Sequence, residues 1–408
     1  MAMTASSRPP QGTGSAAGNP ESERSPFARL TELLAPYRPA KPLITLSLGE
    51  PQHPVPAFVG PVLAKHIADF GRYPIAKGIE PFRRAVATWL SSRFDLPRPM
   101  DPESEILVLN GSREGLFFAA LTAARYVGPR KGRPAILVPN PFYPAYGAGS
   151  RAADCETIYL PTTPANGFLP DLDTLDEATL ARTVAMYIAS PANPQGAVAS
   201  RDYFTRLKKL ADRFGFMIFS DECYSEIYTQ GAPGSMLECA GVDYANVVAF
   251  QSLSKRSNLP GMRIGFAAGD KRFLSAFHEL RNVAAPQVPV PVQHVAVAAY
   301  NDEAHVEENR RLYRLKFDLA DQILGSRYGY RRPAGGFCVW LDVSAKGGDE
   351  AVTVKLYKDV GVRVIPGSYL ARQQPDGSNP GAGFIRLALV ADSETTAEAL
   401  HRLVQILD

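Results

Sequence analysis

The sequence predicts an α/β protein, with a mostly parallel seven-stranded sheet in a large domain and a second, smaller α+β domain. Two observations lead to this prediction. From about residue 105, short uninterrupted apolar runs alternate with helical stretches, which is typical of parallel strands buried on both faces by helices. After about residue 300 the pattern changes to one long polar helix followed by short strands. A length of 408 residues has room for about two or three domains of roughly 100–200 residues.

Seven apolar runs supply the strands of the predicted sheet. They are Ile106–Leu109, Ala135–Val138, Thr157–Leu160, Val184–Ala189, Phe216–Phe219, Val247–Phe250 and Ile264–Ala268. The stretch after the first run carries apolar residues at helical spacing from Leu116 to Ala124, and residues 202–213 form another crossover helix. The order of elements is therefore that of strands joined by helices.

The chain divides into four parts by composition and pattern. Residues 1–25 hold Ser, Gly, Ala and Pro with almost no large apolar side chain, so we expect a disordered tail. Residues 26–70 should form an N-terminal arm and part of the small domain. Residues 71–300 should form the large domain, which begins with an amphipathic helix at 81–94. Residues 301–408 should form the C-terminal small domain, with a helix at 302–324, strands at Phe337–Leu341, Val362–Ile365 and Ile385–Leu389, and a last helix ending at Leu407.

Composition argues against several classes of partner. The chain has 44 basic and 41 acidic residues, a formal net charge of +3, and no block of five like charges, so neither nucleic acid nor an anionic membrane is expected to bind it. Its four cysteines form no C-x-x-C pair, which favours reduced thiols in the cytoplasm over a zinc site or a disulfide framework. We also expect no signal peptide and no membrane span, because no apolar tract is long enough.

The segment from Gln251 to Gly265 is the most informative part of the sequence. Lys255 follows a buried strand, with Ser252 before it and Arg263 eight residues after it. This arrangement suits an aldehyde cofactor that bears a phosphate, because the lysine amine can bond to the aldehyde while serine and arginine bind the phosphate. A solvated lysine on a turn is the simpler alternative. Ser252-x-x-Lys255 also matches the S-x-x-K pattern of serine acylases, but the companion S-D-N and K-T-G elements are missing.

A second candidate group is Asp221 and Tyr224, at the carboxyl end of another apolar strand. Open α/β sheets bind ligands at this end of their strands. A carboxylate there can keep a pyridine nitrogen protonated, so that the ring accepts electrons from a substrate carbanion. Tyr224 can donate a hydrogen bond to the phenolic oxygen of such a ring. Taken alone, an aspartate at a strand end can equally cap a helix.

Two more strand ends carry polar residues. Asn193 lies in Ser190–Gly196 between two prolines, which hold the backbone in a turn and aim one amide side chain; a plain β-turn is the alternative. Gly111, Ser112 and Arg113 join a strand to the start of a helix, where free amides and the positive helix end can hold a phosphate. An ordinary helix cap by Ser112 is the alternative for that segment.

Together, in this order, the four groups resemble the fold-type I, class I/II pyridoxal-phosphate aminotransferases over about residues 40–408. The resemblance implies the cofactor pyridoxal 5'-phosphate, with Lys255 and Asp221 in the roles described. It further implies that Tyr143 stacks on the cofactor, that the Gly49 backbone meets the substrate, and that Arg386 and Asn193 contact the substrate. Arg386 would grip its α-carboxylate, since a guanidinium matches a carboxylate bidentately. Tyr73 resembles the tyrosine that reaches the phosphate of the neighbouring subunit, which implies a homodimer.

Several segments, such as Ser220–Tyr228 and Pro366–Arg372, resemble one branch, the bacterial succinyldiaminopimelate aminotransferases of lysine biosynthesis. The resemblance implies an amino-acid donor and a 2-oxo-acid acceptor, here N-succinyl-L,L-diaminopimelate and 2-oxoglutarate. Arg113 or Arg72 could supply the cation that an acidic distal group requires. Aspartate, alanine or aromatic donors, or a β-lyase reaction on the same fold, are the alternatives, because donor choice depends on side chains scattered over several loops.

Overall fold

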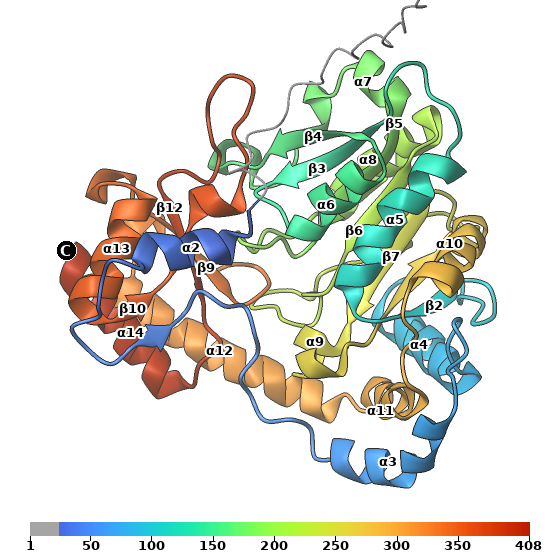
Figure 1. Cartoon of the computed structure of the whole chain (residues 1–408), viewed down its shortest axis with the longest axis horizontal. Coiled ribbons are helices and arrows are strands. Elements are labelled where there is room, and N and C mark those ends of the chain that lie inside the picture. The colour runs from blue at the N-terminus through green and yellow to red at the C-terminus, as the bar shows by residue number, and fades with distance from the viewer. Residues whose placement is uncertain (1–23) are drawn as a thin grey trace, which may run out of the picture.

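The computed structural model describes residues 24–408, so the predicted tail lies outside the described residues up to position 23. Its main feature is a seven-stranded sheet (Figure 1). The strands are β2 (Ile106–Leu109), β3 (Ala135–Asn140), β4 (Glu156–Pro161), β5 (Thr183–Ala189), β6 (Met217–Asp221), β7 (Val247–Ser252) and β8 (Gly265–Gly269). Their order across the sheet is β2-β8-β7-β6-β5-β3-β4. The predicted α/β class and the seven-stranded, mostly parallel sheet are therefore confirmed.

The sheet is parallel except at β8, which runs antiparallel to both of its neighbours. Gly265, the first residue of β8, pairs with Leu109 at the end of β2 and with Ser252 at the end of β7. The chain before β8 therefore meets the carboxyl ends of β2 and β7. This register brings Arg263, which is remote from residue 111 in sequence, to the same edge of the sheet.

Helices cover both faces of this sheet and bury its apolar strands. One apolar core takes side chains from α4 (Glu80–Arg93), α8 (Arg201–Phe214) and α11 (Val290–Tyr300). The core on the opposite face takes them from α5 (Ser112–Tyr126), α6 (Pro144–Ala152) and α10 (Lys271–Ala284). Three shorter helices, α3 (Val59–Lys65), α7 (Glu177–Arg182) and α9 (Leu253–Arg256), lie in the connections. The two cores explain why the strands read as continuous apolar runs.

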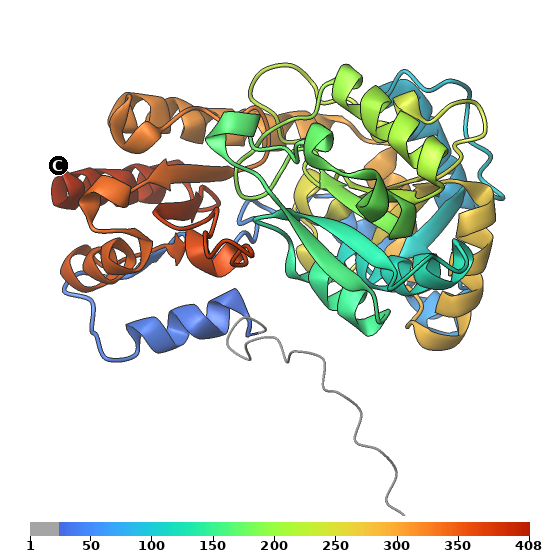
Figure 2. The ribbon, with the colours of Figure 1, turned by 90° about the horizontal axis from the view of Figure 1, so that it is seen from above.

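A second, smaller body forms beside the large sheet (Figure 2). It holds a three-stranded sheet of β11 (Ile365–Pro366), β12 (Phe384–Ala388) and β9 (Cys338–Asp342), and a two-stranded pair of β1 (Ile44–Thr45) and β10 (Val362–Arg363). Its helices are α2 (Pro26–Leu34), α12 (Ala304–Leu324), α13 (Asp349–Val360) and α14 (Ser393–Leu407). Its core joins residues near position 45 to residues after position 316. The division into residues 26–70, 71–300 and 301–408 stays a prediction.

One predicted strand of this body is wrong in detail. The run Val362–Ile365 is two strands, because the chain changes its pairing partner at Val364. Residues 362–363 pair in parallel with β1, whereas residues 365–366 pair antiparallel with β12. The connection places β12 and its Arg386 beside the carboxyl edge of the large sheet. Within residues 24–408, no helix combines the length and the apolar character that a bilayer crossing requires.

Candidate functional site

A cavity of about 1080 Å³ lies at the carboxyl edge of the large sheet and extends to the small body. Most of the predicted site residues line it: Gly49, Ser112, Arg113, Tyr143, Asn193, Asp221, Tyr224, Ser252, Lys255, Arg263 and Arg386. Gly111 adjoins it through Arg263. Tyr73 does not line it, because its side chain is fully exposed on this single chain. The structure thus gathers eleven predicted residues from seven separate segments at one cavity.

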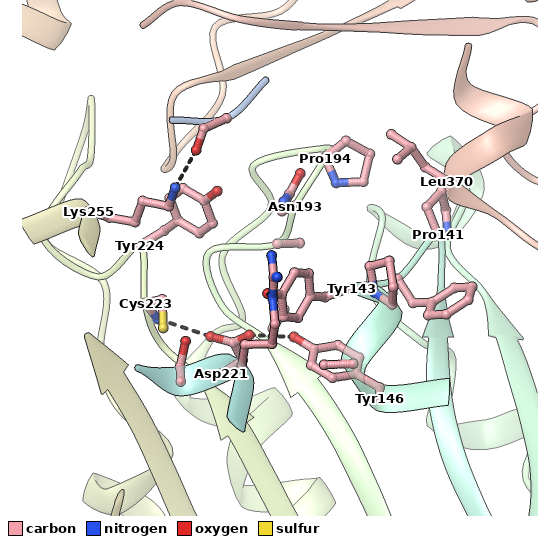
Figure 3. Close-up of a pocket in the computed structure, with 18 of the residues that line it drawn as sticks. Pro141, Tyr143, Tyr146, Asn193, Pro194, Asp221, Cys223, Tyr224, Lys255 and Leu370 are labelled. Carbon is pink, nitrogen blue, oxygen red and sulfur yellow. Dashed lines mark hydrogen bonds between the residues drawn. The ribbon is translucent and has the colours of Figure 1, made fainter. Parts of the chain in front are cut away.

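Lys255 projects from the one-turn helix α9 into this cavity (Figure 3). Its Nζ donates a hydrogen bond to the carbonyl of Gly49 and lies 5.0 Å from the centre of the Phe337 ring. The pKa of Lys255 is lowered to about 8, mainly by burial, and the charge of Arg386 acts in the same direction. The amine is therefore closer to its neutral, nucleophilic form than a surface lysine is at the same pH.

Asp221 ends β6 and lies deeper in the site than Lys255 (Figure 3). Its Oδ2 accepts a hydrogen bond from the Tyr146 hydroxyl at 2.6 Å, and its Oδ1 accepts one from the backbone N–H of Cys223 at 3.2 Å. Burial raises the pKa of Asp221, and these two hydrogen bonds oppose the shift. No arginine or lysine in the described part of the chain forms an ion pair with it. The carboxylate is thus free to pair with a cation in the cavity, and it does not cap a helix.

Tyr146 is a site residue that the sequence did not reveal as one. It lies one helical turn after Tyr143 on α6, and its ring stacks on Tyr187 with the centroids 4.5 Å apart. The available signal was its place three residues after Tyr143 in the same segment. The pairing with Asp221 could not be foreseen, because it joins residues that are 75 positions apart.

The start of α5 and Arg263 form a positive end of the cavity. Gly111 has φ +76° and precedes the helix, whose first residue is Ser112, and no side chain caps that end. The alternative that Ser112 caps the helix is therefore wrong, since Ser112 is already inside it. A Cβ at residue 111 would lie 2.5 Å from Nη2 of Arg263, so only glycine lets this guanidinium approach. Free helix amides and an arginine together make an anion site.

Ser252 belongs to the same end of the cavity. Its Oγ lies 2.9 Å from Ser254 Oγ and 3.2 Å from the carbonyl of Ile264, and it also caps α9. The amine of Lys255 is bonded to Gly49 instead. A serine acylase would require a hydrogen bond between the serine and the lysine of S-x-x-K. Ser252 and Lys255 do not form one.

Arg386 and Asn193 form the opposite side of the site. Arg386 is 5% exposed, its Nη2 donates to the carbonyl of Ser47 at 2.6 Å, and its Nη1 donates to Asn193 Oδ1 at 3.3 Å. Its buried Nε has no hydrogen-bond partner among residues 24–408, and no carboxylate of those residues pairs with the guanidinium. A buried, unpaired guanidinium beside a lysine is suited to bind a carboxylate from a ligand.

Two tyrosines face the cavity between these ends. The Tyr143 hydroxyl accepts a hydrogen bond from Arg113 Nε at 2.6 Å, and the Tyr224 ring packs edge-on against Phe337 at 5.1 Å. Burial raises the pKa of Tyr143 and of Tyr224, so both remain protonated at neutral pH. Apolar residues from four separate segments also line the cavity: Phe27, Leu48, Phe117 and Leu370.

Comparison with known proteins identifies the family. Residues 41–403 match the family described as "Aminotransferase class I and II". The chain belongs to this family. An LL-diaminopimelate aminotransferase of Desulforudis audaxviator is 33% identical over 384 residues, which cover 92% of this chain and 94% of that protein. A crystal structure of an aminotransferase of Neisseria meningitidis is 37% identical, with a TM-score of 0.88, and covers 94% of this chain and 98% of that one. A probable N-succinyldiaminopimelate aminotransferase of Thermus thermophilus is 27% identical, with a TM-score of 0.83, over 94% of this chain and 100% of that one.

The aminotransferases of this class use pyridoxal phosphate, and the site of this aminotransferase fits that cofactor. The unpaired carboxylate of Asp221 suits a protonated ring nitrogen. The uncapped start of α5 with Arg263 suits a phosphate dianion. Lys255 supplies a buried amine of lowered pKa for the aldehyde. Pyridoxal phosphate is therefore the cofactor of this enzyme.

Proposed function

We propose that this aminotransferase takes an amino group from N-succinyl-L,L-diaminopimelate and passes it to 2-oxoglutarate. The observation that carries the proposal is Arg386, a buried guanidinium with no acidic partner that lines the same cavity as the Lys255 amine. Both substrates carry an α-carboxylate that such an arginine can bind. The name of the Thermus relative and the resemblance of the site segments support the succinylated donor.

The roles of the residues follow from their places in the cavity. Pyridoxal phosphate supplies an electron-accepting ring that stabilises negative charge at the substrate α-carbon. Arg386 holds the α-carboxylate and so orients the α-proton toward Lys255, whose Nζ takes that proton. The Asp221 carboxylate favours the protonated form of the ring nitrogen of pyridoxal phosphate, and Tyr224 donates a hydrogen bond into the cavity.

The distal end of the donor distinguishes two closely related proposals. Arg113 lines the cavity and would bind the terminal carboxylate of a succinyl group. Glu50 also lines the cavity and would instead bind the free distal ammonium of LL-diaminopimelate, the donor that the name of the Desulforudis relative suggests. LL-Diaminopimelate is therefore the second candidate donor.

A panel of donors assayed with 2-oxoglutarate tests the proposal. We expect the highest kcat/KM with N-succinyl-L,L-diaminopimelate, and an Arg113→Met change should lower it more than a Glu50→Gln change does. The reverse order of the two variants, with LL-diaminopimelate as the best donor, would favour the second candidate. Best turnover with aspartate, alanine or an aromatic donor would refute both, and release of ammonia with pyruvate from a β-substituted amino acid would indicate a β-lyase.

We also propose that the enzyme is a cytoplasmic homodimer with shared active sites. Four large apolar side chains are more than half exposed on a single chain around the predicted interface residue: Ile67, Phe70, Tyr73 and Ile75. Exposed apolar patches of this kind mark protein interfaces. The four free cysteines support a reducing compartment.

Subunit complementation tests the shared site. Tyr73→Ala and Lys255→Ala homodimers should each be impaired, whereas their heterodimer should regain activity. It would hold one site with an intact Lys255 on one chain and an intact Tyr73 on the other. A heterodimer with no more activity than its parents would overturn the shared-site proposal.

A further inference from the structure

A chain of hydrogen bonds runs from a buried lysine outside the cavity to the backbone of Lys255. Lys316 Nζ lies 2.6 Å from His53 Nε2, and His53 Nδ1 lies 2.6 Å from Asn309 Oδ1. Asn309 Nδ2 in turn donates to the carbonyl of Lys255 at 3.0 Å and to that of Arg256 at 3.3 Å. Both Asn309 and Lys316 lie on α12, which passes beside α9 (Figure 1).

When Lys316 is charged, only one assignment of protons satisfies every hydrogen bond from Lys316 to Asn309. An ammonium group has no lone pair and must donate, so His53 Nε2 must accept. The proton of the neutral imidazole then lies on Nδ1, which donates to Asn309 Oδ1, and the amide nitrogen of Asn309 is left to face the two carbonyls. A protonated His53 would offer Lys316 no acceptor. The chain therefore specifies both the imidazole tautomer and the orientation of the Asn309 amide.

Burial makes this arrangement costly to break. Asn309 and Lys316 are each 2% exposed. Lys316 also donates to the carbonyl of Val390 at 3.2 Å and lies 4.9 Å from the centre of the Tyr313 ring. No carboxylate in residues 24–408 forms an ion pair with it. Burial lowers the pKa of Lys316 to about 8, and burial together with the charge of Lys316 lowers the pKa of His53. An apolar residue would avoid this cost, so stability alone does not explain the lysine.

The same loop also holds the other end of Lys255. Gly49 accepts a hydrogen bond from the side-chain amine, and His53, four residues later, reaches the Lys255 backbone through Asn309. Helix α9 has only four residues, too few to hold its own position. We propose that His53 and Asn309 are positioning residues that hold Lys255 and the loop of Gly49 as one unit, with Lys316 selecting the His53 tautomer. The proposal rests on the proposed role of Lys255.

Three substitutions of His53 separate the two halves of the hydrogen-bond chain, namely the contact with Lys316 and the contact with Asn309. His53→Phe keeps a ring beside Tyr313 and removes both nitrogens. His53→Asn places an amide near the Nδ1 position and so keeps the bond to Asn309, whereas His53→Gln places one near Nε2 and keeps the contact with Lys316. We expect kcat to fall about 5- to 100-fold in His53→Phe, since a buried donor is left unsatisfied, and to fall similarly in Asn309→Asp. His53→Asn should recover most of the loss and His53→Gln little.

Three further measurements distinguish positioning from general stability. The rise in KM for the amino donor in His53→Phe should be smaller than the fall in kcat, because Arg386 itself is unchanged. In cofactor-free protein, the amides of residues 253–256 should exchange hydrogen faster than in the wild type. The affinity for pyridoxal phosphate, measured by absorbance titration, should fall. Lys316→Met should show the same three effects without a lower melting temperature.

A matched control removes a buried cation elsewhere. Arg402 on α14 donates to the carbonyls of Pro42 and Val360. Arg402→Met should lower the melting temperature and leave the exchange of residues 253–256 unchanged. The proposal is overturned if the His53 variants match the wild type in exchange and kcat, or if they merely lose stability as Arg402→Met does. Failure of the proposed role of Lys255 is a separate outcome, in which Lys255→Ala keeps full activity.

Discussion

Lys255, which is partly buried, and Lys316, which is buried, have the same lowered pKa and different surroundings. Burial lowers the pKa of each to about 8. The amine of Lys255 lines the cavity and bonds to one backbone carbonyl, whereas Lys316 is 2% exposed and enclosed by an imidazole, a carbonyl and an aromatic ring. A lowered lysine pKa thus reports burial, and only access to a ligand makes such a lysine a candidate for catalysis.

Lys255 has charged neighbours of both signs, whereas an acid is the charged neighbour that acts on Lys316. Arg386 lowers the pKa of Lys255 and Glu50 raises it, whereas Asp392 raises the pKa of Lys316. A cation beside Lys255 favours the neutral amine that takes up a proton. An acid near Lys316 favours the ammonium form that must donate to His53. Arg386 and Asp392 therefore each favour the protonation state that the role of the neighbouring lysine requires.

The largest expected effect separates the two lysines by activity. Lys255→Ala should lower kcat by about 10²–10⁴-fold, the usual contribution of a positioned acid–base group, and should abolish the visible absorbance band of the bound cofactor. Lys316→Met should keep the band and lose far less activity. Stopped assays and absorption spectra of both variants measure this. Equal losses in the two variants would remove the distinction drawn between them.

The next largest effect concerns Arg386, the cationic neighbour of Lys255. Arg386→Lys keeps the positive charge and loses the planar fork that binds a carboxylate, so the KM of the amino donor should rise. Loss of a buried charged contact costs about 2–5 kcal/mol, which corresponds to a rise of at least about 30-fold. Arg386→Gln should, in addition, raise the pKa of the free Lys255 amine, which the pH dependence of its acylation rate in cofactor-free protein would detect. An unchanged KM in both variants would place the carboxylate site elsewhere.

The sequence predicted the cavity around Lys255 far better than it predicted the buried hydrogen bonds around Lys316. Lys255, Asp221 and Arg263 were found because each follows or precedes a buried strand, and parallel strands bring their ends to one edge. The antiparallel β8 still fits this logic, since its start pairs with the ends of β2 and β7. Local pattern and sheet geometry were therefore enough for these three residues, whereas Gly49, Tyr143 and Arg386 were expected only from the family resemblance.

The parts that could not be predicted depend on packing between distant segments. His53 and Lys316 are 263 positions apart, and neither belongs to a motif that indicates a hydrogen bond. The same holds for Tyr146 with Asp221, and for the break at Val364, where the chain leaves one sheet and joins another. Lys316 resembles any polar residue on a charged helix, because its burial follows from the placement of α12 against the small sheets. Such contacts require the three-dimensional structure.

A smaller effect tests whether burial acts alike on the two lysines. In each case the folded pKa is about 8 and the ordinary value is 10.5, so the unfolded chain binds more protons between these pH values. Stability of the cofactor-free protein should therefore rise with pH through this window, by at most about 3 kcal/mol for each lysine. Urea unfolding of wild type, Lys255→Met and Lys316→Met from pH 7.5 to 10 measures the slopes. Both variants should show a flatter rise than the wild type, and a variant with the wild-type slope would have lost no shifted group.

The smallest effect concerns the acid near Lys316. Asp392 is exposed and caps α14 by accepting hydrogen bonds from Thr395, so Asp392→Asn keeps a good capping residue and removes only the charge. The pKa of Lys316 should fall a little further, and the free energy of unfolding at pH 7 should drop by less than about 1 kcal/mol. Part of that drop is the lost attraction between a carboxylate and the start of a helix, which is independent of Lys316. A double-mutant cycle with Lys316→Met separates the two contributions. If the change costs the same in both backgrounds, Asp392 acts only on its helix, and the ammonium form of Lys316 is maintained by His53, Val390 and Tyr313 alone.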